Sequence, residues 1–124
     1  MKIERFTDLR VWKQAHELTL LIYKLSETFP RSERFGMISQ IRRSACSVSA
    51  NIAEGFGRRS TRELLRSMQI ARGELEETRY FLILGRDLGH VKEPDFERTT
   101  ASCDTVGKLI NALGSSLKKR LLEN

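Results

Sequence analysis

Little in this sequence indicates stabilisation by cross-links or a place in a membrane. Its 124 residues include 2 cysteines, 2 prolines and 8 glycines. Cys46 and Cys103 are too few and too far apart for a disulfide scaffold, so we expect two buried thiols. The first ten residues carry charges without the apolar stretch of a signal peptide, and no run approaches the about 18 apolar residues of a membrane span. We therefore expect a cytoplasmic protein that makes no contact with a membrane.

Residues arranged for catalysis or metal binding are also missing. His16 and His90 have no His or Cys three or four residues away, which excludes the usual spacing of metal ligands. Cys46 has no histidine nearby in sequence to activate it, and no Glu-x-x-His pair of a di-iron bundle is present. We expect His16 to pack against Trp12, one helical turn earlier. The sequence thus predicts no catalytic residue, no metal ion and no cofactor.

Positive charge is abundant and concentrated in one segment. The chain has 22 Lys and Arg against 16 Asp and Glu, and its pI is near 9.7. Between residues 31 and 72 there are nine basic residues, all arginine, and three glutamates, whereas the rest of the chain is neutral. Arginine offers planar, bidentate donors to phosphate or carboxylate groups. The segment is therefore either a binding surface for such groups or a solvated surface with spare cations.

Apolar residues repeat at alternating intervals of three and four, which predicts four helices over residues 8–29, 33–55, 61–88 and 94–121. The first two stripes are Val11, Ala15, Leu18, Ile22, Leu25 and Phe29, and then Ile38, Ile41, Ala45, Val48 and Ile52. The last two are Leu64, Met68, Ala71, Leu75, Thr78 and Leu82, and then Phe96, Cys103, Val106, Ile110, Leu113, Leu117 and Leu121. No segment alternates as a half-buried strand does.

Capping residues and helix breakers set the expected helix ends. Thr7 and Ser32 are predicted N-caps of the first two helices, and Pro30 ends the first. Gly55 and Gly57 are predicted to stop the second helix. The third opens on a capping-box pattern, Ser60-Thr61-Arg62-Glu63, and ends near Gly89, and the fourth starts at Pro94. Short connections make successive helices antiparallel, so residues 1–124 are expected to form one all-α domain, an up-down-up-down four-helix bundle.

Two apolar runs are longer than packing against a single core requires. Residues 80–84 (Tyr-Phe-Leu-Ile-Leu) and 20–23 (Leu-Leu-Ile-Tyr) are apolar throughout. Consecutive helical residues point about 100° apart, so neither run can face one core entirely. We expect some of these side chains to cover a second copy, and hence a symmetric homo-oligomer. The alternative is a few exposed apolar side chains, which are common.

The segment joining the second and third helices carries the strongest binding signal. Its glycines permit unusual backbone shapes, and the N-terminus of the third helix would present free N–H groups to an anion. The predicted contacts are Arg42, Arg43, Arg58, Arg59, Arg62 and Arg66. The alternative is a plain turn with solvated arginines. Asn51 and Glu54, beside this segment, either bond backbone groups at the following turn or form a polar latch at an oligomer seam.

Several blocks resemble a known family. They are Phe6-x-x-Leu9-x-Val11-Trp12-x-x-Ala15, Phe29-Pro30-x-x-Glu33-x-Phe35-Gly36, Gln40-Ile41-x-Arg43-Ser44, Ser47-Val48-x-x-Asn51-Ile52-Ala53-Glu54-Gly55 and Ala71-Arg72-Gly73. Together they resemble the 23S rRNA intervening-sequence protein family across nearly the whole chain. The resemblance implies an antiparallel four-helix bundle that assembles as a homopentamer, with Asn51, Glu54 and Gly55 as signature residues. Two positions depart from the family: Met37 replaces a frequent Leu, and Glu74 replaces a frequent Ser, which adds a carboxylate that could weaken anion binding.

The family context favours a nucleic-acid partner without establishing one. Some relatives are encoded inside insertions of rRNA genes, and a similar bundle partners the reverse transcriptase of diversity-generating retroelements. We expect a non-enzymatic oligomer that binds structured RNA, or DNA, through its arginines. Phe56 is the only aromatic residue beside them, which favours folded nucleic acid over single strands. The alternative is a protein-interaction scaffold whose arginines meet an acidic protein, such as a polymerase-like enzyme.

Overall fold

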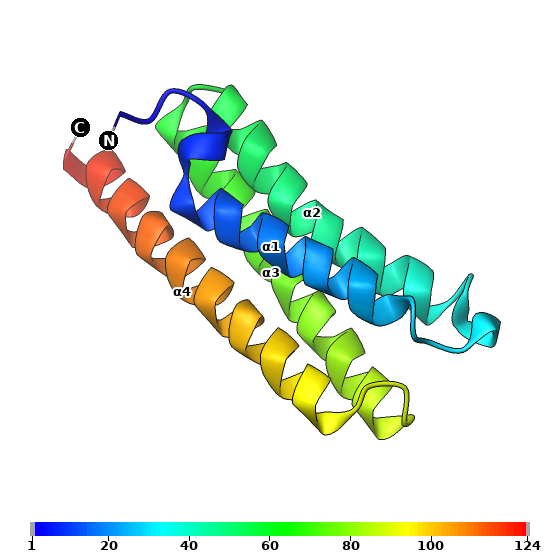
Figure 1. Cartoon of the computed structure of the whole chain (residues 1–124). Helices are drawn as coiled ribbons and strands as arrows, with labels where there is room; N and C mark the ends of the chain where they lie inside the picture. The colour runs from blue at the N-terminus through cyan, green and yellow to red at the C-terminus, as the bar shows by residue number, and fades with distance from the viewer. Residues whose placement is uncertain (1, 124) are drawn as a thin grey trace.

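The computed structural model describes residues 2–123, which form four helices and contain no strand (Figure 1). The helices are α1 (Arg10–Ser26), α2 (Met37–Gly57), α3 (Thr61–Asp87) and α4 (Glu93–Glu123). Two short 3-10 turns, η1 (Phe6–Asp8) and η2 (Arg31–Glu33), precede α1 and α2. The prediction of an all-α protein is confirmed. None of the helices in this part of the chain is long and apolar enough to cross a membrane.

The buried core follows the periodic stripes of the sequence. All six residues of the first predicted stripe, from Val11 to Phe29, are buried, although Phe29 lies beyond the end of α1, and α2 contributes Ile41, Ala45, Val48 and Ile52. Only a few members of the stripes, such as Ile38 and Leu64, are partly exposed. Cys103 is buried as predicted, but Cys46 is only partly buried, because it lies on the outer side of α2. The apolar pattern therefore decides which face of each helix turns inward.

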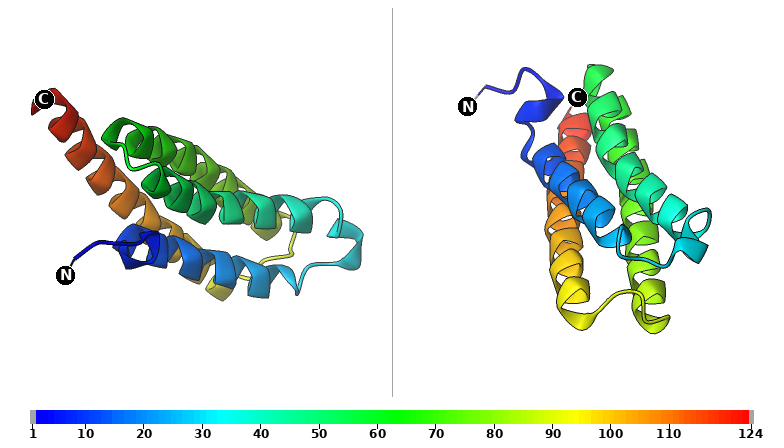
Figure 2. Two further views of the ribbon diagram at one scale, coloured as in Figure 1. Left: turned by 90° about the horizontal axis from the view of Figure 1, so that it is seen from above. Right: turned by 45° about the vertical axis from the view of Figure 1, so that its right-hand side comes forward.

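Contacts between side chains fix how the helices lie beside one another. The Thr19 hydroxyl donates to the Ala45 carbonyl, 3.1 Å away, and joins the middle of α1 to the middle of α2. The Ser44 and Thr78 hydroxyls are 2.8 Å apart between α2 and α3, whereas Gly55, further along α2, lies against the earlier residue Ser67. α2 and α3 therefore run in opposite directions, and Figure 2 shows the four helices from two further sides. Both ends of the chain lie at one end of the bundle (Figure 1).

The helix boundaries differ from the predicted ones at both ends, and α1 ends at Ser26 rather than at residue 29. α1 begins at Arg10 rather than at residue 8, because the Asp8 carboxylate accepts the N–H groups of Glu4 and Arg5 and stabilises the turn η1. These two bonds lower the pKa of Asp8. Thr7 is therefore not the N-cap; Leu9 occupies that position without a side-chain cap.

Helix α2 begins at Met37, four residues after the predicted start, so Ser32 is not its N-cap. Residues Arg31–Glu33 form the separate turn η2, and Gly36 leads into the helix. The α3 prediction holds at its start, where the Ser60 hydroxyl accepts the Glu63 N–H at 3.3 Å. α4 begins one residue before Pro94.

The glycine at position 55 does not end α2, contrary to the prediction. Gly55 is buried inside the last turns of the helix, and α2 continues to Gly57. A Cβ atom on Gly55 would stand 2.4 Å from the Ser67 Cβ of α3, a distance that real Cβ atoms do not reach. Gly55 thus permits close packing of α2 against α3. The chain leaves α2 at Arg59, whose φ of 55° is in the left-handed region.

Both apolar runs leave side chains in solvent, as expected. Leu20 is 57% exposed and Tyr80 is 56% exposed, and Tyr23 and Ile83 also belong to the exposed set. Trp12 and His16 stack with an interplanar angle of 8°, as predicted for residues one turn apart.

Candidate nucleic-acid interface

The surplus of positive charge occupies one half of the bundle. The contacts of Thr19 with Ser49, Ser44 with Thr78 and Arg79 with Asp104 mark the middle of the helices. We define the terminal half, which holds both chain ends, as residues 2–17, 48–74 and 108–123, and the distal half as residues 18–47 and 75–107. The terminal half has thirteen Lys and Arg against seven Asp and Glu, whereas the distal half has nine of each. The whole net charge of +6 therefore lies in the terminal half.

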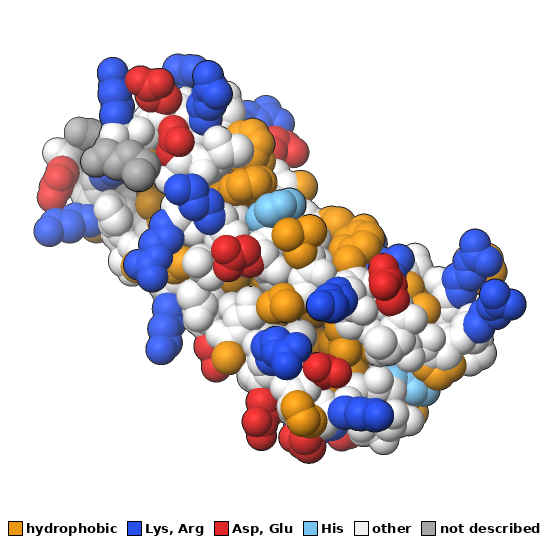
Figure 3. Space-filling model, in the orientation of Figure 1, with side chains coloured by type: hydrophobic (Ala, Val, Ile, Leu, Met, Phe, Trp, Pro, Cys, Tyr) orange, Lys and Arg blue, Asp and Glu red, His pale blue; other side chains and the backbone are white. Residues whose placement is uncertain are grey.

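The space-filling view agrees with this division. Lys and Arg side chains gather at the end where both chain ends lie, with fewer acidic side chains between them (Figure 3). Charges of one sign collected at one end of a molecule attract polyanions and raise their rate of association. This segregation arises from the fold, because it combines the arginines after α2 with the basic residues Lys118, Lys119 and Arg120 at the end of α4.

Three of the six predicted arginines are unpaired and lie close together in this half. Arg59 follows α2, and Arg62 and Arg66 lie one turn apart in the first turns of α3. All three are exposed, and none forms an ion pair with a carboxylate of the described residues. Their guanidinium groups are free to meet an incoming anion.

Arg58 is adjacent to these three and makes a weak contact. Its Nη2 lies 3.2 Å from Glu54 Oε1, one turn back in α2, and both side chains are well exposed. Such surface pairs contribute at most about 1 kcal/mol, so Arg58 can exchange Glu54 for a phosphate at little cost.

The remaining two arginines lie elsewhere and already have partners. Arg42 donates from Nε to the Ser26 hydroxyl at 2.8 Å and covers the Tyr23 ring, with 4.6 Å from Cζ to the ring centre. Arg43 forms ion pairs with Glu74, at 3.0 Å, and with Glu77. Arg58 comes fifteen positions after Arg43, which corresponds to about 22 Å along the helix axis. The structure therefore separates the six predicted residues into two groups.

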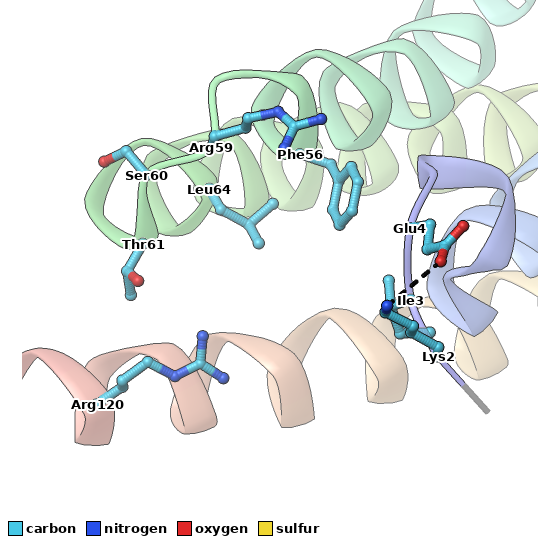
Figure 4. A pocket seen from close by; sticks show the side chains of 10 residues that line it. Lys2, Ile3, Glu4, Phe56, Arg59, Ser60, Thr61, Leu64 and Arg120 are labelled. Atoms are coloured by element: carbon cyan, nitrogen blue, oxygen red, sulfur yellow. Dashed lines mark ion pairs between the residues drawn. The ribbon is translucent and has the colours of Figure 1, made fainter.

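A cleft adjoins the first group and includes residues that sequence reasoning missed (Figure 4). It has a volume of about 530 Å³ and is formed by the segment before η1, the α2–α3 connection and the end of α4. Its lining residues are Lys2, Ile3, Glu4, Gly55, Phe56, Arg59, Ser60, Thr61, Leu64 and Arg120. Arg120 is 61 positions after Arg59 in the sequence, so only the packing of α4 could reveal their proximity. The one signal in the sequence is the run of three basic residues at 118–120.

The electrostatics of the cleft favour an anion. Lys2 lies 3.6 Å from Glu4, so these two charges offset each other. Arg59 and Arg120 have no carboxylate partner among residues 2–123. The N-terminus of α3 opens at the same place and adds the partial positive charge of its dipole.

The signature residues beside the cleft have structural contacts. Asn51 Nδ2 donates to the Ser47 carbonyl at 2.8 Å and to the Ser47 hydroxyl at 3.0 Å, so Asn51 bonds a backbone group, but not at the predicted turn. The partner belongs to the preceding turn rather than to the following one. Glu54 pairs with Arg58, and Gly55 supports the close approach of α2 and α3.

Other titratable side chains lie away from this interface. Burial raises the pKa of Cys103 to about 12, so its thiol stays protonated at neutral pH. His90 Nε2 is 3.2 Å from Glu33 at the distal end. Within residues 2–123, no group of three or more His, Cys, Asp or Glu side chains is placed to hold a metal ion.

Comparison with known families shows which family this chain belongs to. The profile of the family described as 23S rRNA-intervening sequence protein matches residues 7–112. The chain belongs to this family. The matched region contains all six predicted arginines, and it ends before Lys118 and Arg120. The family match therefore covers the arginine-rich connection but only part of the cleft.

A solved structure shows a similar fold. It is a crystal structure of a protein of unknown function from the S23 ribosomal protein family of Bacteroides thetaiotaomicron. The TM-score is 0.78 and the sequence identity 26%, over 84% of this chain and 97% of that one. No curated protein matches this member of the 23S rRNA-intervening sequence protein family.

Proposed function

We propose that this protein is a non-enzymatic, cytoplasmic bundle that binds structured RNA, or another nucleic acid, through its terminal half. The observation that carries the proposal is the segregation of charge: the full surplus of six positive charges lies in one half, around Arg59, Arg62 and Arg66. Phosphate contacts supply much of the affinity of nucleic-acid binding and carry no sequence information. The proposed contacts are Arg58, Arg59, Arg62 and Arg66, extended by Arg120.

Arg42 and Arg43 stay outside the proposed interface. Each already bonds partners within the bundle through part of its guanidinium group, and turning that group fully to a phosphate would break those contacts. They lie in the half whose charges balance, so the long-range attraction for a polyanion is weaker there.

A homo-oligomer is part of the proposal. The exposed side chains of Leu20, Tyr23, Tyr80 and Ile83 support association with further copies. The family resemblance implies a homopentamer. Several terminal halves in one assembly would bind a long RNA with avidity, because each contact after the first is intramolecular.

The second candidate is a protein-interaction scaffold with no nucleic-acid contact. Its support is the chemistry of arginine, which pairs with carboxylates as readily as with phosphates. An acidic protein, such as a polymerase-like enzyme, would then occupy the same unpaired arginines. The two candidates differ in what remains bound after nuclease treatment.

The test is binding of purified, nuclease-treated protein to a folded RNA and a matched DNA duplex, measured by fluorescence anisotropy across a salt series. Arg62→Glu with Arg66→Glu should abolish most of the binding and flatten the dependence on salt. The matched control is Arg31→Glu with Arg34→Glu, which makes the same charge change on exposed arginines of the distal half. Equal losses in both double variants would contradict a local interface. Absence of binding by the intact oligomer would favour the protein scaffold.

A further inference from the structure

Among the aromatic side chains, Phe56 is exceptional in having no partner for its ring. The chain has nine Phe, Tyr and Trp residues. Eight of them pack against another ring or a guanidinium group, as Tyr23 does with Arg42 and Phe96 with Arg86. Phe56 has no such neighbour in the described part of the chain, and its partly exposed side chain lines the cleft.

The two unpaired arginines of the cleft approach the same space as this ring. In Figure 4 the Phe56 ring points into the cleft beside the Arg59 side chain, and Arg120 points into the cleft from α4. Ile3 and Leu64 add apolar surface beside the ring. The cleft therefore combines one aromatic platform with cations on two sides, which is the combination that binds a nucleotide: bases stack on aromatic rings and guanidinium groups grip phosphates.

The size of the cleft limits what can enter. Its volume of about 530 Å³ lies in the range of pockets that hold one small molecule. A duplex cannot enter such a space, because its two backbones and the base pairs between them are far larger than one small molecule. Unpaired nucleotides leave the stack readily and are the parts of folded RNA that proteins read with aromatic side chains.

We propose that the cleft receives a single unpaired nucleotide of the bound RNA, with its base on Phe56 and its phosphate between Arg59 and Arg120. This inference rests on the proposed RNA-binding function and adds to it a preference for RNAs with an unpaired nucleotide. The arginines on the outer surface of α3 would hold the paired regions, and the cleft would select RNAs that carry an unpaired nucleotide. Strand ends and internal bulges both supply this chemistry.

The test compares three RNA hairpins of equal stem length: fully paired and blunt, with one unpaired nucleotide at the end, and with one bulged nucleotide in the stem. Binding to the native oligomer is measured by anisotropy, and a fluorescent purine analogue at the unpaired position reports stacking. We expect the end or the bulge to improve affinity by about fivefold or more over the blunt hairpin, the gain typical of one stacked base. Which of the two improves affinity identifies the source of the nucleotide.

Two variants assign the effect to the cleft. Phe56→Leu keeps an apolar side chain but removes the ring, and Arg120→Gln removes a cation near the end of α4. Each should abolish the gain and the stacking signal. Phe56→Leu should leave binding of the blunt hairpin within about twofold, whereas Arg120→Gln also removes a proposed phosphate contact and should weaken all three hairpins to a similar, modest extent. Lys119→Gln, the same charge change on the neighbouring exposed residue outside the cleft, should keep the gain.

The outcomes separate this inference from the proposed function. Tight binding of all three hairpins with no difference between them would overturn the nucleotide site and leave the RNA-binding function intact. A gain that survives in both cleft variants would also overturn it. Failure to bind any hairpin would contradict both proposals.

Discussion

Gly55 in α2 and Ser67 in α3 are so close that a Cβ atom at position 55 would stand 2.4 Å from the Ser67 Cβ. No rotation of the serine side chain relieves this contact, because the backbone fixes the position of its Cβ atom. The tight packing lies beside the cleft, which Gly55 itself lines. One pair of small residues thus determines where the neighbouring residues Phe56 and Arg59 stand.

We expect Gly55→Ala to destabilise the protein by about 1–3 kcal/mol, the usual cost of overpacking a core. Alanine favours a helix over glycine by about 1 kcal/mol, and this gain offsets only part of the cost. Gly114→Ala is the control, because a Cβ there meets no atom within 4 Å, and it should stabilise the protein slightly. Chemical denaturation followed by circular dichroism measures both. An unchanged midpoint for Gly55→Ala would show that α2 and α3 are not closely packed.

The contacts of Arg42 and Arg43 predict a role in stability rather than in binding. Arg43→Gln should cost less than about 1 kcal/mol of unfolding free energy, because the Arg43 side chain is 46% exposed and water screens its ion pairs. RNA affinity should change by less than about twofold. Removing one proposed phosphate-binding arginine from the terminal half should instead reduce the magnitude of the slope of log K against log salt concentration by about one. Arg42→Gln should behave in the same way as Arg43→Gln. A loss of RNA affinity equal to that of Arg62→Gln would place the interface across the middle of α2.

The buried thiol of Cys103 predicts a difference in reactivity between the two cysteines. Burial raises the pKa of Cys103 from 9.0 to about 12, so the reactive thiolate is scarce at pH 8. Cys46 is partly exposed, and a thiol reagent should label it first in the native protein. In denaturant both cysteines should react at similar rates. Fast labelling of both in the native state would contradict the burial of Cys103.

The same thiol makes stability depend on pH in the alkaline range. In the folded protein Cys103 keeps its proton, whereas in the unfolded chain it ionises near pH 9. The folded state therefore binds more protons, and stability falls as pH rises from about 9 to about 12. Cys103→Ala should remove this part of the pH dependence, although it also costs packing. Denaturation midpoints of both proteins at several alkaline pH values measure the difference.

The helices and their inward faces are predictable because apolar residues recur every three or four positions along each helix. The stripe from Val11 to Phe29 is the simplest case. Helix starts are less predictable, because local bonds compete for the same residues: Asp8 caps the turn before α1, and Arg31–Glu33 forms its own turn before α2. The prediction for Gly55 is wrong because glycine serves both as a helix stop and as a small residue in a close contact, and sequence alone does not separate the two.

The candidate site is predictable only where it is continuous in sequence. Arg58, Arg59, Arg62 and Arg66 follow one another closely, and their shared surface needs only one turn and one helix. Arg42 and Arg43 look equivalent to them in the sequence, because pairing with Ser26, Glu74 and Glu77 depends on tertiary packing. Arg120 is not predictable from the sequence for the same reason, because only the packing of α4 brings this residue to the cleft.

The exposed apolar side chains of α1 predict where copies associate. Leu20 and Tyr23 lie one turn apart, and the Tyr23 hydroxyl is 3.3 Å from Cys46 Sγ on α2, so this surface extends across both helices. Beyond it α2 presents the small exposed residue Ala50, whereas charged residues flank Tyr80 on α3. Leu20→Glu would bury a charge at an interface formed here, and we expect it to dissociate the oligomer.

Light scattering after size exclusion should show a smaller mass for Leu20→Glu with unchanged helix content. Lys24→Glu, an exposed charge change one turn further along α1, should leave the mass unaltered. RNA affinity should then fall in Leu20→Glu more than in Lys24→Glu, although the lysine variant loses more positive charge, because avidity requires several terminal halves in one assembly. An unaltered oligomer mass in Leu20→Glu would show that the copies associate through another face of the bundle.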